Sequence, residues 1–331
     1  MNRKVPWVRI PPRPRTNLFR HLLPCGSLNI LILGAGYVGS VLARSLHRQG
    51  HDVTAWTRTE DSAATLRADG LRTVAGDLAD GWIWDGFNEL WDAAVFCASS
   101  SRGGIEAYRH VYGRGLRRAL ERTGRMGHFI YTSSTSVYSQ DDGSEVDEAS
   151  PAVPRSETSE ILVEAEDRVL AAYGTVLRLS GIYGPERTVY LEKYVQGGAA
   201  LPGDGGRWVN MIHRDDAASA AAHLLGRPEA AGQIYNATDS CPVRLRTLVE
   251  WLAARQGCAA TAAGAPEDAG RKRGITSKRV SNAKLRRLGW EPLYPSYREG
   301  YASLLQACAL QNAEGHGIVR PPGQSASAGE I

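Results

Sequence analysis

Asn29-Ile-Leu-Ile-Leu-Gly-Ala-Gly-Tyr-Val-Gly39 is the stretch of the 331-residue sequence that decides the fold. Its first five residues are almost all apolar, which is typical of a short β-strand buried on both faces. The pattern then predicts a glycine-rich turn over Gly34–Gly39 and a helix over Tyr37–Gln49, which Gly50 ends. A Gly-x-Gly-x-x-Gly turn between a strand and a helix predicts a dinucleotide-binding site.

Each glycine of the turn has a predicted role. Gly34 permits the tight bend, Gly36 lets a diphosphate approach the backbone, and Gly39 lets the helix pack against the strand. The start of the helix, at Tyr37 and Val38, then offers free amides and a positive dipole to the phosphates. The alternative is a glycine-rich turn that binds nothing.

The end of the next strand indicates which dinucleotide is bound. An acidic residue there would bind the 2′-hydroxyl of NAD, but the sequence over 53–58 ends in Arg58. An arginine can pair with a 2′-phosphate, so we expect NADP(H). Asp52 stands at the wrong end of the strand, whereas Glu60 and Asp61 could still reach the ribose.

Two further segments are expected to contact the cofactor. Asp77 and Leu78 follow the third strand, and Asp77 either accepts a hydrogen bond from the adenine amino group or only forms a turn. Ala98 and Ser99 follow the fourth strand and should line the middle of the cofactor.

Strands alternate with helices along the first half of the chain, which predicts an α/β fold with a doubly wound parallel sheet, the Rossmann fold. A smaller C-terminal substrate lobe should close over it. The expected strands are 29–33, 53–57, 72–75, 93–97, 128–132 and 175–179, and the expected long helices are 107–123 and 157–173. The expected parts are a disordered or spurious extension (1–27), a dinucleotide-binding domain (28–180, with 209–235 packed back onto it), the lobe (181–208 and 236–310) and a disordered tail (311–331).

Composition excludes some classes of function. The formal net charge of +4 comes from six basic residues within 1–27, and the rest of the chain holds 33 basic against 35 acidic residues. We therefore expect no nucleic-acid partner, although the basic run over 271–279 is either a solvated face or a nucleic-acid contact. No apolar run is long enough for a bilayer, no metal motif occurs, and five unclustered cysteines favour a reducing, cytoplasmic location.

Seven segments in this order resemble the extended short-chain dehydrogenase/reductase superfamily, the NAD(P)-dependent epimerases and dehydratases. They include Tyr131-Thr-Ser-Ser-Thr-Ser-Val-Tyr138 and Leu177-Arg-Leu-Ser-Gly-Ile-Tyr-Gly-Pro185. The others are 33–39, 76–78, 210–216, 235–239 and 288–290. The C-terminal segments over 277–300 resemble an atypical, nucleoside-diphosphate-sugar epimerase-like branch, whose members often lack the full active site. The resemblance implies NADP binding and a possible homodimer through the helices over 107–123 and 157–173.

The resemblance also implies a catalytic serine, tyrosine and lysine. Ser134 matches the serine, which would hydrogen-bond a substrate oxygen. Ser156 and Glu160 stand where the Tyr-x-x-x-Lys pair is expected, and no Tyr or Lys occurs between Ser139 and Ala172. The lysine normally holds the ribose and lowers the pKa of the tyrosine, so this site is degenerate.

Other residues could supply the proton. By position the candidates are Tyr138, Tyr183, His213 and Glu160, and each of them could instead be structural. The sequence thus leaves two functions open. One is an NADP(H)-dependent oxidoreductase or epimerase-like enzyme that acts on a hydroxyl or carbonyl of a small polar or sugar-nucleotide-like substrate. The other is a non-catalytic NADPH-binding sensor or scaffold.

Overall fold

A central sheet of seven parallel strands organises the computed structural model, which describes residues 26–85, 90–100, 103–123, 127–258, 263–265 and 276–313. The strands lie in the order β12-β7-β5-β4-β1-β2-β3. The chain adds strands on one side of β1 and then on the other, which is the doubly wound arrangement that was predicted. Their bounds are β1 (Asn29–Leu33), β2 (Asp52–Thr57), β3 (Arg72–Ala75), β4 (Ala93–Phe96), β5 (His128–Ser134), β7 (Thr175–Leu179) and β12 (Ile234–Ala237).

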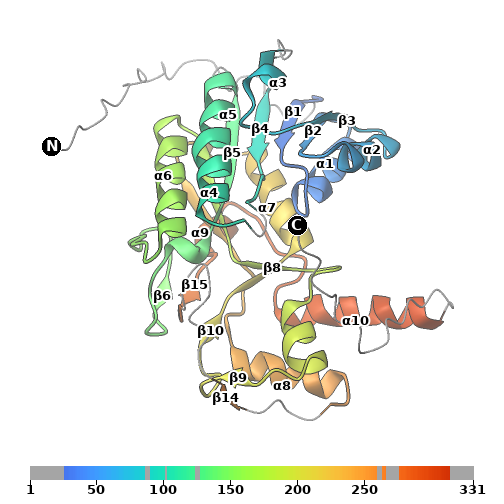
Figure 1. Cartoon of the computed structure of the whole chain (residues 1–331), viewed down its shortest axis with the longest axis vertical. Coiled ribbons are helices and arrows are strands. Elements are labelled where there is room, and N and C mark those ends of the chain that lie inside the picture. Colours follow the sequence, from blue (N-terminus) through green and yellow to red (C-terminus); the bar gives the residue numbers. More distant parts are fainter. Residues whose placement is uncertain are drawn as a thin grey trace, which may run out of the picture.

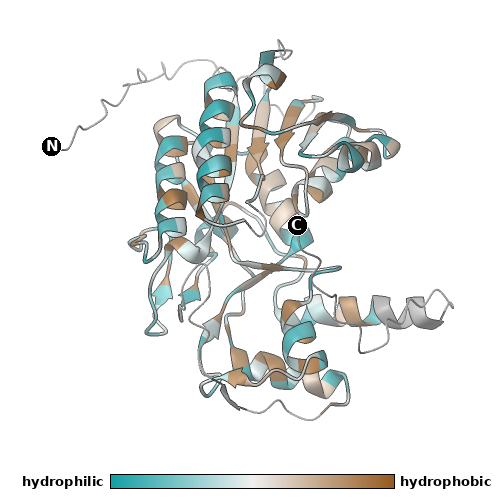
Figure 2. Ribbon diagram, viewed as in Figure 1, coloured by the Kyte–Doolittle hydropathy of each residue, from teal (hydrophilic) through white to brown (hydrophobic). Residues whose placement is uncertain are grey.

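Helices cover both faces of this sheet, and each presents its apolar side to it (Figures 1 and 2). One apolar cluster joins β1 to α1 and α7, and the other joins β4 and β5 to η1, α5 and α6. The helical bounds are α1 (Gly39–Arg48), α2 (Glu60–Ala68), α3 (Gly81–Asp85), α4 (Ile105–Tyr108), the π-helix η1 (Arg109–Gly115), α5 (Leu116–Thr123), α6 (Glu157–Ala171) and α7 (Arg214–Leu225).

A smaller lobe lies below the carboxyl ends of the strands (Figure 1). Its own core contains aromatic and aliphatic side chains from η3, α8 and α10, including Tyr194, Leu248 and Tyr301. The remaining elements are η2 (Thr135–Val137), β6 (Glu145–Val146), β8 (Gly181–Tyr183), η3 (Leu191–Gln196), β9 (Leu201–Pro202), β10 (Trp208–Val209), β11 (Met211–His213), η4 (Pro228–Ala230), β13 (Val243–Arg244), α8 (Leu245–Arg255), β14 (Ala263–Ala265), β15 (Arg279–Val280), α9 (Ala283–Arg287) and α10 (Tyr297–Ala313).

The chain crosses between the two parts more often than the predicted boundaries allow. β12 is the edge strand of the large sheet, and α9 with Trp290 packs into the same core as α1, although 236–310 was assigned to the lobe. Within the described part of 240–310 three helices begin, α8, α9 and α10. Most of the predicted extension (1–27) and tail (311–331) lies outside the described residues. No helix in the described ranges has both the length and the apolar character needed to cross a membrane.

The buried His128 at the start of β5 should make folding depend on pH. Its Nε2 lies 2.8 Å from the Thr175 hydroxyl, and burial lowers the pKa of His128 to about 4. The unfolded chain takes up a proton near the ordinary histidine pKa, whereas the folded chain does so only near the lowered value. The stabilisation is therefore complete at neutral pH and is lost as the pH falls between those two values, by roughly 3 kcal/mol in all.

The measurement is urea unfolding at several pH values. We expect His128→Gln to unfold with a flatter pH dependence than the wild type. His47→Gln, at an exposed histidine, serves as the control and should retain the wild-type slope. Equal slopes for all three proteins would contradict the assignment to His128.

Candidate cofactor and active site

The glycine-rich turn lies between β1 and α1, and its three glycines have three different environments. Gly34 has a φ of +95°, and a Cβ there would clash with the backbone of Ala98. A Cβ on Gly39 would clash with the carbonyl oxygen of Gly34 and come within 3.3 Å of the Cys97 Cβ. A Cβ on Gly36 would meet nothing within 4 Å. Two of the glycines are thus needed by the fold itself, and the third borders open space.

The start of α1 is free to bind an anion. Val38, the N-cap residue, makes no side-chain capping hydrogen bond. Among the described residues, the amides of Tyr37 and Val38 donate to no backbone carbonyl or side chain. Uncapped amides and the helix dipole together attract phosphate. These residues and the open space beside Gly36 therefore fit the diphosphate of a dinucleotide.

Arg58 and Asp77 lie near each other beyond the ends of β2 and β3. Arg58 is exposed, and its guanidinium makes no hydrogen bond or ion pair within the described part of the chain. Asp77 is held by the Ala79 amide at 2.8 Å and by His110 Nε2 at 2.8 Å. Burial alone would raise the pKa of Asp77, but these hydrogen bonds and the nearby charge of Arg58 lower it. Arg58 is thus the free cation here, and Asp77 is largely engaged.

His110 is a residue of this site that sequence reasoning missed. It lies in η1, and its ring also approaches the second carboxylate oxygen of Asp77, at 2.9 Å. No local pattern indicates the contact, because Asp77 and His110 lie 33 residues apart in the sequence. His110 fixes the Asp77 carboxylate, so the predicted contact from Asp77 to adenine stays a prediction.

The other predicted cofactor residues take different positions. Leu78 packs against the apolar cluster that contains residues of β4 and α5, and its carbonyl accepts a 2.9 Å hydrogen bond from Trp84 Nε1. Ala98 packs against Gly34, and Ser99 is exposed just beyond the carboxyl end of β4. Ala98 and Ser99 therefore lie next to the glycine-rich turn, whereas Leu78 contributes mainly packing.

Ser134 ends β5, where a substrate-binding serine is expected. Its hydroxyl accepts a hydrogen bond from the Ser136 amide at 3.2 Å. The neighbouring first turns of α6 bury Thr158, Ser159 and Leu162. The Ser159 hydroxyl donates to the Ser136 carbonyl at 3.4 Å, so this face of α6 is turned toward the Ser134 segment. That face, all of it within the described residues, offers hydroxyl and methyl groups but no amine or phenol.

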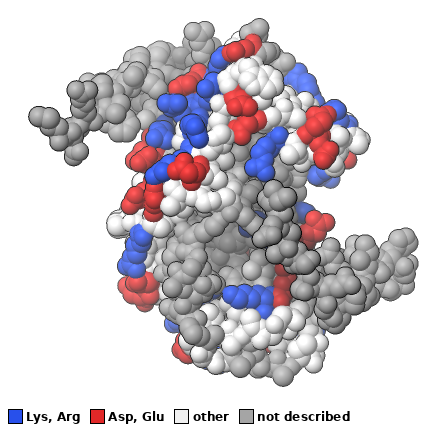
Figure 3. Space-filling view, viewed as in Figure 1, with Lys and Arg blue, Asp and Glu red and all other residues white. Residues whose placement is uncertain are grey.

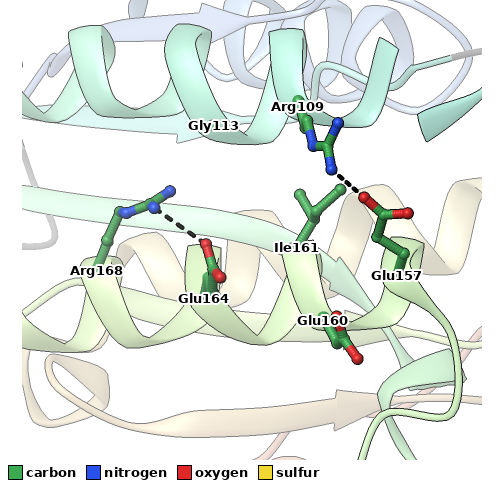
Figure 4. A pocket seen from close by; sticks show the side chains of 7 residues that line it. All are labelled: Arg109, Gly113, Glu157, Glu160, Ile161, Glu164 and Arg168. Atoms are coloured by element: carbon green, nitrogen blue, oxygen red, sulfur yellow. Dashed lines mark hydrogen bonds and ion pairs between the residues drawn. The ribbon is translucent and has the colours of Figure 1, made fainter. Parts of the chain in front are cut away.

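Glu160 lies on a different side of α6 from this hydroxyl-lined face. It is exposed and lines a groove between η1 and α6, where its neighbour Glu157 pairs with Arg109 (Figure 4). A helix turns about 100° per residue, so Glu160 cannot share the face of Thr158 and Leu162. Ser156, the other predicted position, caps α6 and accepts from the Ser159 amide at 3.3 Å. This placement argues against Glu160 as a base beside Ser134.

The same groove belongs to the surface where a second copy was expected. Basic and acidic side chains are interspersed over α5 and α6 (Figure 3). Arg168 and Glu164, which lie four residues apart on α6, approach within 3.2 Å across this surface. The homodimer through these helices stays a prediction.

Tyr138 lies in the core rather than in an open site. Its hydroxyl donates to Asn236 Oδ1 at 3.0 Å, and the Arg178 guanidinium lies 4.7 Å from its ring centroid. Burial raises the pKa of Tyr138. A fully buried phenol that already donates to an amide is poorly placed to protonate a substrate, so the geometry does not favour the predicted catalytic role.

Tyr183 and His213 contact each other at the junction with the lobe. Their rings meet edge to face at 5.4 Å, and Tyr183 also stacks on Tyr301 at 4.8 Å. His213 caps α7 through a 3.3 Å hydrogen bond from the Asp215 amide to its Nδ1. Burial raises the pKa of Tyr183 and lowers that of His213. The ring contacts and the cap are structural, but the Tyr183 hydroxyl and His213 Nε2 are buried without a hydrogen-bond partner among the described residues, so a chemical role for either residue stays a prediction.

Lys278 is a second residue that the sequence did not reveal. The basic run over 271–279 was interpreted as a solvated face or a nucleic-acid contact, but Lys278 is buried, and 271–273 lie outside the described residues. Its amine donates to the Tyr138 carbonyl at 2.7 Å and to the Thr276 hydroxyl at 2.9 Å. Burial lowers the pKa of Lys278 to about 8. The amine fastens the C-terminal segment to the end of the Ser134–Tyr138 segment.

Comparison with known proteins defines the class to which this fold and site belong. Residues 30–238 match the model of the NAD-dependent epimerase/dehydratase family, and the chain belongs to that family. The chain is 30% identical over 275 residues to the Escherichia coli (strain K12) protein YeeZ, which covers 80% of this chain and 96% of that protein.

Two other relatives support this assignment. The 2-alkyl-3-oxoalkanoate reductase of Stenotrophomonas maltophilia is 31% identical over 258 residues, covering 70% of this chain and 76% of the reductase. A solved structure from Methylobacillus flagellatus, assigned as an NAD-dependent epimerase/dehydratase, superposes with a TM-score of 0.71 at 31% identity and covers 86% of this chain and all 100% of its own. The resemblance derived from the motifs is therefore confirmed.

Proposed function

We propose that the protein is an NADP(H)-dependent oxidoreductase or epimerase-like enzyme that acts on a hydroxyl or carbonyl of a small polar or sugar-nucleotide-like substrate. One observation carries the proposal: the open space at Gly36 lies beside the uncapped start of α1. A Cβ would fill the space that a diphosphate needs, and the free amides have no other ligand among the described residues. Family membership supports the same conclusion.

The proposed preference for NADP(H) rests on the residue beyond β2. Arg58 is exposed and free to pair with a 2′-phosphate, whereas Asp77 is held by Ala79 and His110, and Glu60 pairs with Arg67. An NAD-binding site would instead present a free carboxylate to the ribose hydroxyls. When bound, the nicotinamide would supply or accept a hydride.

The proposed chemistry is hydride transfer at a carbon that carries oxygen. The Ser134 hydroxyl can orient that oxygen from the carboxyl end of β5. The name of the Stenotrophomonas relative, a 2-alkyl-3-oxoalkanoate reductase, supports a carbonyl substrate. The face of α6 turned toward Ser134 carries Thr158, Ser159 and Leu162 rather than a lysine, so no ammonium group there lowers the pKa of a proton donor. In this proposal the proton comes from solvent.

The same face of α6 favours a second candidate, a protein that binds NADPH without consuming it. Turnover separates the two. The protein is incubated with NADPH and a panel of ketones, imines and sugar nucleotides while the absorbance of NADPH is followed. Consumption that Ser134→Ala lowers about 100-fold, with NADPH binding unchanged, supports the enzyme. Tight binding without consumption on any substrate supports the sensor.

Replacement of Arg58 tests the choice of cofactor. We expect Arg58→Ala to weaken NADPH binding about 10- to 100-fold, since one charge-assisted hydrogen bond to a phosphate contributes roughly 1.5–3 kcal/mol. NADH lacks the 2′-phosphate, so its affinity should change less than about threefold. Calorimetry measures both, with Arg48→Ala at the C-terminal end of α1 as a control that leaves both unchanged. Equal weakening of the two nucleotides would defeat the 2′-phosphate assignment.

A further inference from the structure

Tyr37, within the glycine-rich turn, is contacted by residues far away in the sequence. Its hydroxyl donates to the Pro185 carbonyl at 2.8 Å. The guanidinium of Arg187 lies 5.5 Å from the centroid of the Tyr37 ring, and that of Arg214 lies 5.3 Å from it. Two cations and a carbonyl thus surround the one aromatic side chain of the turn that is expected to hold the diphosphate.

The turn that carries Arg187 has a constrained backbone. Gly184 and Arg187 exchange two backbone hydrogen bonds, of 3.3 and 3.0 Å, across Pro185 and Glu186. Glu186 has a φ of +62°, which favours glycine or asparagine, and strain of this kind is concentrated at functional sites. A Cβ on Gly184 would lie 2.9 Å from the Tyr37 hydroxyl, so the turn packs directly on Tyr37.

The two arginines differ in whether their guanidinium is paired with a carboxylate. Arg214 Nε donates to Asp215 Oδ1 at 2.9 Å. Arg187 is exposed, and within the described residues its guanidinium makes no hydrogen bond or ion pair and lies over the Tyr37 ring. Stacking on an aromatic ring leaves the N–H groups at the edge of a guanidinium available to an anion. Arg187 therefore holds an unused positive charge at the start of α1.

We propose that Arg187 binds the nicotinamide-side phosphate of the cofactor diphosphate, and this inference rests on the proposed function. The lobe then contributes the positive charge of Arg187 to the phosphate, and the amides of Tyr37 and Val38 donate hydrogen bonds to the same diphosphate. A guanidinium suits this task because it matches the geometry of phosphate oxygens. Tyr37 acts as a positioning residue, since its ring and hydroxyl hold the 184–187 turn in place.

The order of the strands indicates which of the two phosphates Arg187 meets. Arg58 and Asp77 stand beyond β2 and β3, on one side of β1, where the adenosine half is expected. The 184–187 turn follows β8, which the chain reaches from β7 on the other side of β1. Arg187 thus approaches the glycine-rich turn from the side of Ser134 rather than from that of Arg58.

Nucleotide fragments test this assignment by calorimetry on the full chain. ADP-ribose carries both phosphates of the diphosphate but no 2′-phosphate. Adenosine 2′,5′-bisphosphate carries the 2′-phosphate and only the adenosine-side phosphate. We expect Arg187→Ala to weaken NADP⁺ and ADP-ribose about 10- to 100-fold and to leave the bisphosphate within about twofold. Arg58→Ala should show the reverse pattern for the two fragments.

Arg298→Ala is a matched control, because Arg298 is also exposed and lies 4.8 Å from the centroid of a tyrosine ring, that of Tyr297. It should bind all three nucleotides as the wild type does. Arg187→Gln, which keeps most of the side chain that packs on Tyr37, should reproduce the loss seen with Arg187→Ala, and circular dichroism confirms that both variants fold.

Unchanged binding of ADP-ribose by both Arg187 variants would overturn the inference. An equal loss for the bisphosphate would overturn the choice of phosphate. If the wild type binds none of the nucleotides, the proposed function itself fails, and that outcome cannot be confused with the first two.

Discussion

Replacing Arg178 with methionine is expected to lower the free energy of unfolding by about 3–5 kcal/mol. Arg178 on β7 meets Glu166 on α6 in a buried pair, with side chains only 4% and 2% exposed. Arg178 Nη2 lies 2.6 Å from Oε2 of Glu166, and Arg178 Nε lies 3.0 Å from Oε1. The Ser133 hydroxyl also donates to Oε1, at 2.6 Å. Removing only the arginine leaves a buried carboxylate without its counter-charge, which is the costly outcome.

Urea unfolding monitored by circular dichroism measures this loss. Arg168→Met is the matched control, because Arg168 pairs with Glu164 on the exposed side of the same helix, and it should cost less than about 0.5 kcal/mol. The double variant Glu166→Leu/Arg178→Met should recover most of the loss, since two apolar side chains need no counter-charge. A double variant less stable than Arg178→Met alone would show that the loss does not come from the unpaired carboxylate of Glu166.

The central sheet was predictable because short-range signals determine it. The bounds of β1, β3 and β7 agree with those expected, since each is a short run rich in apolar or β-branched residues that a Gly or Ser ends. The last strand of the sheet, β12, was not predicted as part of it. Its edge position depends on pairing with β7, which lies about sixty residues earlier, and no local pattern encodes such pairing.

The candidate site was predictable where it depends on the backbone and not where it depends on long-range contacts. The spacing of the glycines is visible in the sequence, and glycine is the residue that adopts the backbone angles of a tight turn, so the turn could be placed from sequence. The rotation of α6 could also have been found, because Leu162, Ala165 and Val169 form an apolar stripe that continues back to Thr158 and leaves Glu160 outside. An alignment on an expected Tyr-x-x-x-Lys pair ignored that stripe.

Contacts of Lys278 and His110 had no such signal. Lys278 meets the Tyr138 carbonyl 140 residues away, and His110 meets Asp77 across 33 residues. A charged residue in a basic run looks the same in sequence whether it is solvated or buried. Only the folded chain shows that Lys278 is buried against the segment that begins at Ser134.

Replacing Gly36 with valine is expected to weaken NADPH binding at least about 100-fold while leaving the fold intact. A Cβ on Gly36 meets no atom within 4 Å, and its φ is not in the left-handed region, so the free energy of unfolding should stay within about 0.5 kcal/mol of the wild type. The added side chain would occupy the space that a diphosphate must enter to reach the amides. The lost charge-assisted contact and the steric crowding of the ligand add up to roughly 3 kcal/mol of binding free energy, which corresponds to an affinity about 100-fold lower.

Two other glycines make this experiment specific. Gly113→Val also adds a side chain where a Cβ meets nothing within 4 Å, but on η1, and it should bind NADPH as the wild type does. Gly34→Ala should instead destabilise the protein, because Gly34 has a φ of +95° and lies against the Ala98 backbone. Calorimetry with NADPH and thermal unfolding separate the two kinds of loss. A Gly36→Val variant that binds NADPH as tightly as the wild type would mean that the diphosphate does not lie on this turn. The proposals for Arg58 and Arg187 would then also fail, because both assume that position of the diphosphate.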